Sequence, residues 1–186
     1  MGILDNFKKK NKQQSVECAG NGLLEIIKIA SLQNDEILRQ AQECIENTSE
    51  YYKDHREDFE ARGLFVKDEL SFLQWIGCID LLINNEFACE CDWKEERDEF
   101  VFQISFLQGI DTLALEIDSE WFDQNQAIPE WCEILDEKWK KSNCVVAAFD
   151  IDSDSYVMFP CRKDDIKKLS ELAEGFGYRI GYAKDM

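Results

Sequence analysis

The order of apolar and polar positions predicts helices through most of the first half of the chain. Residues 22–32 place apolar side chains at helical spacing, and a second helix follows Asn34, which is a good N-cap residue. A weaker helical segment comes next and ends at Gly63, as helices with glycine at C′ do. The most apolar helix covers residues 66–85, and its apolar stripe is wide enough to predict burial over much of its circumference.

The middle of the chain is less regular. Residues 86–93, "EFACECDW", alternate and predict a short strand or an extended connector. Asp92 and the glutamate three residues later resemble a capping box, which favours a helix over residues 92–109, although "FVFQISF" within it also alternates with the period of a strand. Residues 112–118 predict a brief strand, and Pro129 suits the first position of another helix.

The last third has the clearest pattern. "CVVAAFDI" and "SYVMFP" predict two strands, "DDIKKLSELAEGFG" predicts an amphipathic helix, and "YRIGY" predicts a final strand. This hairpin–helix–strand order predicts an α+β fold, in which N-terminal helices pack with a small, mainly antiparallel sheet formed by the C-terminal half. We expect a single domain over residues 17–186, preceded by a basic tail over residues 1–16.

The net charge of −18 narrows the range of partners. Lys8, Lys9, Lys10 and Lys12 crowd the N-terminus, so the rest of the chain is more acidic still. Such a body repels phosphate backbones, which argues against nucleic-acid binding. The acidity either serves ordinary solubility or matches a cationic partner protein, and the composition leaves both open.

The eight cysteines and the N-terminal sequence bear on location. "MGILDNFKKKNKQQ" lacks the apolar core of a secretion signal, and no apolar run is long enough for stable membrane insertion. We therefore expect a cytoplasmic protein whose cysteines are reduced and mostly buried.

The stretch "FDIDSDSYVMF" is the nearest feature to a chemical motif. Asp150, Asp152 and Asp154 alternate as in a calcium loop, but Ser155 stands where that loop needs glycine, and Cys161 stands where it needs glutamate. Aspartate and serine also form turns through bonds to nearby backbone N–H groups. The pattern favours an aspartate-rich hairpin. Such a hairpin is compatible with a weak divalent-cation site or with a polar contact to a partner.

Other chemical templates do not match. Cys89 and Cys91 are too close for a structural zinc pair, and His55 is the chain's single histidine. The chain has no phosphate-binding loop, no G-x-S-x-G and no H-E-x-x-H motif. We predict no metal, no cofactor and no catalytic residue.

Two stretches together resemble a known family. "QWIGCIDLLINNEFACECDWKEERDEF" and "FDIDSDSYVMF" are similar to an uncharacterised bacterial domain of unknown function, over about the last two-thirds of the chain and without the first sixty residues. The resemblance implies no activity, but it implies that the helix aspartate, the Asp-Trp-Lys segment and the aspartate hairpin lie near one another. The matching residues are Trp75, Asp80, Asp92, Trp93, Lys94, Asp152, Ser153, Asp154, Ser155 and Tyr156.

These observations favour a non-catalytic cytosolic interaction protein of bacterial origin, of an immunity or regulatory type, that engages a basic partner protein. A metal-assisted enzyme is the alternative, and it requires Asp80, Asp92, Asp152 and Asp154 to converge within about 5 Å, the reach of shared metal ligands. The candidate residues for contact with a partner or a weakly bound cation are Asp80, Asp92, Asp150, Asp152, Asp154 and Tyr156.

Overall fold

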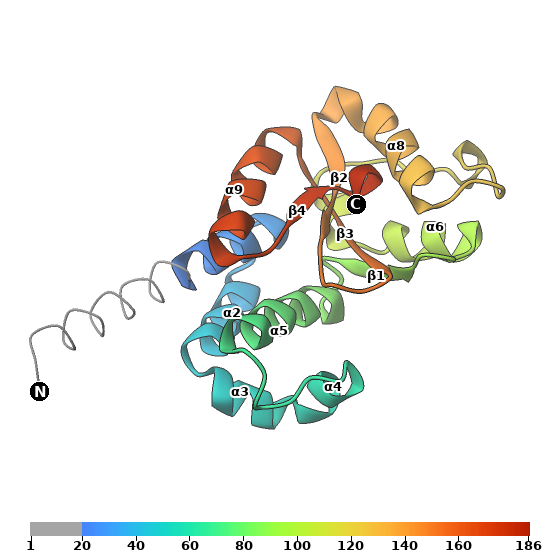
Figure 1. Cartoon of the computed structure of the whole chain (residues 1–186). Helices are drawn as coiled ribbons and strands as arrows, with labels where there is room; N and C mark the ends of the chain where they lie inside the picture. The colour runs from blue at the N-terminus through green and yellow to red at the C-terminus, as the bar shows by residue number, and fades with distance from the viewer. Residues whose placement is uncertain (1–19) are drawn as a thin grey trace, which may run out of the picture.

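A computed structural model of the chain describes residues 20–186 and confirms the α+β prediction (Figure 1). A four-stranded antiparallel sheet lies at its centre, with the strand order β1-β3-β2-β4. The predicted basic tail over residues 1–16 lies outside the described residues. The strands are β1 (Cys89–Asp92), β2 (Cys144–Phe149), β3 (Ser155–Arg162) and β4 (Ile180–Tyr182).

The helices follow the predicted pattern closely in the first half and in the last third. Residues 20–30 are helical, and the Asn34 side chain caps the next helix by accepting from the N–H groups of Glu36 and Ile37, each at 3.1 Å. The α-helices that follow are α2 (Asp35–Glu46), α3 (Thr48–Asp54), α4 (Arg56–Ala61), α5 (Leu70–Asn84), α6 (Arg97–Ser105), α7 (Gln108–Thr112), α8 (Ile128–Lys138) and α9 (Ile166–Phe176).

The sheet is covered by helices on both faces, which divides the apolar interior into two cores. Val145, Ala147 and Phe149 of β2 face the N-terminal helices, α5 and α9, whereas Val146 and Ala148 face α6, α7 and α8 (Figure 1). Because both faces are covered, every residue of β2 is buried and the strand is continuously apolar instead of alternating.

The cysteines contribute to these cores. Seven of them are free and buried, as expected for cysteines that pack as small apolar side chains, and Cys18 lies outside the described residues. In the described part of the chain, no helix combines the length and the apolar character needed to cross a membrane.

Two predictions for the middle of the chain are wrong. The helix expected over residues 92–109 is two helices, because Asp92 ends β1, α6 begins only at Arg97, and the chain turns before α7. Gly109 in α7 packs so closely on Pro160 of β3 that a β-carbon would collide with the proline ring. Residues 112–118 form no strand in the structure. Their alternating pattern would give a strand an apolar and a polar face, but a strand also needs a neighbouring strand for its backbone hydrogen bonds, and in the described part of the chain the sheet contains only the strands β1 to β4.

Candidate functional site

The aspartate-rich stretch forms the turn between β2 and β3. Phe149 pairs with Val157, which leaves residues 150–154 as the connection. The Asp150 carboxylate accepts the N–H of Asp152 at 3.0 Å, and Asp152 has a φ of 57°, in the left-handed region that aspartate tolerates better than most residues. The hairpin prediction is confirmed, and short-range side-chain bonds to the backbone hold its turn.

The base of this turn is tied to two distant segments. The Asp150 N–H donates to the Arg179 carbonyl at 3.0 Å, and the indole N–H of Trp75 donates to the Asp150 carbonyl at the same distance. Trp75 is fully buried in α5, and its ring stacks on that of Tyr178 with the centroids 4.6 Å apart. The turn therefore projects from a rigid base.

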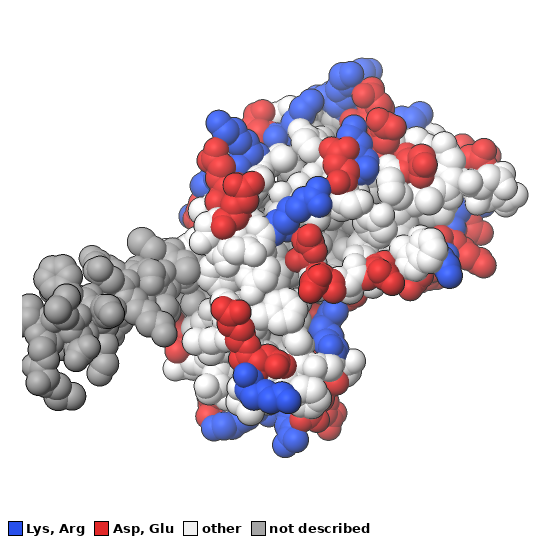
Figure 2. All heavy atoms as spheres, viewed as in Figure 1, with Lys and Arg blue, Asp and Glu red and all other residues white. Residues whose placement is uncertain are grey.

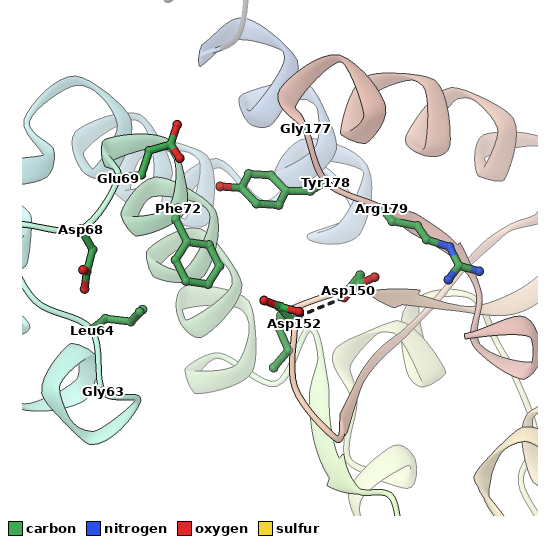
Figure 3. A pocket seen from close by; sticks show the side chains of 11 residues that line it. Gly63, Leu64, Asp68, Glu69, Phe72, Asp150, Asp152, Gly177, Tyr178 and Arg179 are labelled. Atoms are coloured by element: carbon green, nitrogen blue, oxygen red, sulfur yellow. Dashed lines mark hydrogen bonds between the residues drawn. The ribbon is translucent and has the colours of Figure 1, made fainter.

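A cleft of about 760 Å³ opens beside the turn. Its walls come from three parts of the chain: the connection and first turn of α5 over residues 63–72, the hairpin turn, and residues 177–179 (Figure 3). The rings of Phe72 and Tyr178 lie 6.1 Å apart between centroids and form an aromatic floor. Burial raises the pKa of the Tyr178 hydroxyl, so this side chain stays neutral at physiological pH.

Four carboxylates surround this floor, those of Asp68, Glu69, Asp150 and Asp152. Among residues 20–186, none of the four takes part in a salt bridge. Arg179 is the basic residue of the lining, but its side chain points away from the cleft and its guanidinium donates to the Asp185 carbonyl at 2.9 Å (Figure 3). The cleft is consequently anionic, with no cation aimed into it from its own lining.

A second, smaller cleft of about 380 Å³ lies on the other side of the turn. Asp154, Tyr156 and Trp93 line it. The Trp93 ring is exposed, and the Lys94 ammonium lies over it, 4.4 Å from the ring centroid. The two clefts share Asp150, Ile151 and Arg179. The turn thus forms the partition between them.

Asp80 belongs to a different cluster. Arg62 bridges Asp80 at 2.6 Å and Glu90 at 2.7 Å, and the three side chains are only 24%, 15% and 26% exposed, respectively. Burial raises the pKa of Asp80 because the loss of hydration outweighs the attraction of the shared guanidinium. This triad joins the end of α4 to α5 and β1, and so fixes the connection that forms one wall of the larger cleft.

A family model described as a domain of unknown function (DUF6630) matches residues 22–184. The chain belongs to this family. The match starts far closer to the N-terminus than expected, so the prediction that the first sixty residues lie outside the family is wrong. Searches of curated proteins and of solved structures found no match.

The DUF6630 fold brings only some of the predicted site residues together. Asp150, Asp152, Asp154 and Tyr156 surround the two clefts, whereas Asp80 and Asp92 line neither. Asp92 lies close to the turn, since it pairs with Ser155 and the next residue donates its N–H to the Asp154 carbonyl at 3.2 Å. Within residues 20–186, no three His, Cys, Asp or Glu side chains are grouped in a way that could hold a metal ion.

Sequence reasoning missed half of the larger cleft. Asp68, Glu69, Phe72, Tyr178 and Arg179 were assigned only to helix or strand patterns. The sequence pattern placed residues 66–69 in the predicted helix over residues 66–85, whereas α5 begins only at Leu70 and leaves Asp68 and Glu69 in the connection before it. The remaining residues become neighbours only through the packing of α5 against the sheet.

Proposed function

We propose that this protein is a non-catalytic interaction module that binds a basic segment of a partner protein in the larger cleft. The observation that carries the proposal is the set of four carboxylates around the floor of Phe72 and Tyr178, with the lining's own arginine directed elsewhere. Ammonium and guanidinium groups are attracted both to carboxylates and to aromatic faces.

The surface around the cleft supports the same class of partner. Acidic side chains are spread over this face of the molecule among basic ones, and several of them lie near its centre (Figure 2). A field of one sign around a cleft steers oppositely charged partners toward it and raises the association rate. Above about 0.1 M salt, where the Debye length falls to about 10 Å, this steering should weaken.

We place this interaction in the bacterial cytoplasm and in a regulatory or immunity role, in which binding alone is the function. The acidic composition and the buried free cysteines support that setting. The volume of the cleft falls within the usual range for ligand sites, so one or two basic side chains can enter it together.

The test uses the full chain and a defined probe, an acetylated and amidated Phe-Lys-Lys-Lys peptide. Replacing two cleft carboxylates in the double variant Glu69→Gln/Asp152→Asn should weaken binding of this peptide about fivefold or more at low salt. Titration calorimetry at low and at high salt measures the change in Kd.

The matched control is Asp111→Asn/Glu120→Gln. These two acids are exposed and line neither cleft, and their replacement changes the net charge by the same amount. The control should bind the peptide nearly as well as the original protein. Equal weakening in both double variants would show general charge attraction and would refute a site in the cleft.

A further inference from the structure

The chain segment that forms one wall of the larger cleft also exposes large apolar side chains next to the lining residues, and we call these side chains the apolar margin. Six large apolar side chains stand exposed among the described residues, and three of them, Phe65, Val66 and Leu70, belong to the same wall of the cleft at 45%, 63% and 49% exposure. Their neighbours Leu64 and Glu69 line the cleft itself. An occupant that matches both features carries apolar residues directly beside basic ones.

The chain itself contains a segment of this composition. Residues 3–12 read "ILDNFKKKNK", with Ile3, Leu4 and Phe7 followed at once by lysines. Four of the 21 basic residues of the chain fall within residues 8–12. The charge and the apolar content of this segment both complement the cleft.

The segment is also tethered close to the cleft. Gly22 lies against α9, since a β-carbon at Gly22 would be 3.8 Å from the Leu172 side chain (Figure 1). Leu172 precedes the cleft residue Gly177 by five positions, a rise of about 7.5 Å along a helix. The eight residues from position 12 to position 20 span up to about 26 Å, so the lysines can reach the cleft of their own molecule.

We propose that residues 3–12 are an intramolecular ligand of the larger cleft and that a basic partner must displace them. The lysines meet the cleft carboxylates, while Ile3, Leu4 and Phe7 contact the apolar margin. A short tether gives such a segment an effective concentration in the millimolar range, so even a weak contact competes with an external ligand. This inference rests on the proposed function, because it assigns a regulator to the same site.

The location of the segment is tested by zero-length coupling with a carbodiimide in the full-length protein, followed by mass spectrometry. The expected products join the lysines of residues 8–12 to Glu69 and Asp152, and they form within one chain when light and ¹⁵N-labelled protein are mixed. Products spread over acids throughout the surface would refute the proposal. Products between chains alone would assign the cleft to a second copy and also refute it.

The competition is tested with the Phe-Lys-Lys-Lys peptide. The variant Ile3→Ser/Leu4→Ser/Phe7→Ser keeps the net charge, so a change in affinity cannot arise from long-range attraction. We expect it to bind the peptide about threefold tighter or more, because the internal competitor is weakened. The same three substitutions should have no such effect when Glu69→Gln and Asp152→Asn are also present.

The two proposals fail in distinguishable ways. If Glu69→Gln/Asp152→Asn weakens peptide binding but the three serine substitutions do not strengthen it, only the intramolecular ligand is refuted. If the peptide does not bind the cleft at all, the proposed function itself is refuted.

Discussion

Two clusters of acidic side chains, one around Arg62 and one around the larger cleft, differ in their counter-charge. Asp80 and Glu90 share Arg62, and all three side chains are mostly buried. The four cleft acids surround an open aromatic floor, and no cation of the lining points at them. The acids of the first cluster therefore share an arginine, whereas the acids of the cleft have no cationic partner in its lining.

The position of Arg62 follows from the end of α4. Arg62 is the C-cap residue, and Gly63 takes a φ of 74°, which glycine adopts without strain. The chain turns at this point, so the arginine reaches inward to α5 and β1 while the following residues form the wall of the cleft. One helix end thus supplies the counter-charge of the first cluster and leads into the wall of the cleft.

Removing the shared cation should have the largest effect on stability. Arg62→Met leaves two partly buried carboxylates next to each other without a counter-ion, which should lower the free energy of unfolding by about 2–4 kcal/mol in a urea titration. The matched control is Arg39→Met, whose ion pair with Glu36 on α2 is exposed to solvent, so its loss should change the free energy of unfolding far less than the loss of Arg62 does. Similar losses in both variants would contradict the distinction between the two kinds of cluster.

A smaller effect is expected from the titration of Asp80. Its folded-state pKa is raised above the ordinary value of 3.8, mainly by burial, so the folded protein binds this proton more tightly than the unfolded chain does. The resulting stability is fully present below the unfolded pKa and is lost as the pH rises through the folded pKa.

The direction of this pH dependence can be measured by comparison with the variant Asp80→Asn, whose side chain at position 80 does not titrate. The free energy of unfolding of the original protein, relative to that of the variant, should decrease as the pH rises from below 3.8 through the raised pKa. An increase over the same interval would mean that the attraction of Arg62 outweighs burial.

The smallest effect on stability is expected in the cleft. Asp152 is exposed, and asparagine also tolerates the left-handed backbone at this position, so Asp152→Asn should change the free energy of unfolding by less than about 0.5 kcal/mol. Millimolar calcium or magnesium should not raise the Tm of the original protein. A rise of several degrees that this substitution abolishes would show a cation site at the turn, because binding to the folded state stabilises it.

The accuracy of sequence reasoning differed along the chain for identifiable reasons. The helix at residues 70–84 was predictable because its apolar residues recur at helical spacing over four turns. The break between α6 and α7 was not predicted by the local pattern, and the close approach of Gly109 in α7 to Pro160, fifty-one residues later in the chain, exists only in the folded structure. Asp80 was predicted to lie near the turn, but it lines neither cleft, because Arg62 holds its carboxylate beside that of Glu90.

The sequence by itself determined the hairpin and its turn, because the bonds that form the turn join residues only two positions apart. The tertiary structure decided where that turn lies and what faces it. Trp75 holds the turn from seventy-five residues away, and Arg62 meets Glu90 across twenty-eight. Contacts over such separations exist only once the helices have packed on the sheet, and they separate the acids that stabilise the fold from those that line the cleft.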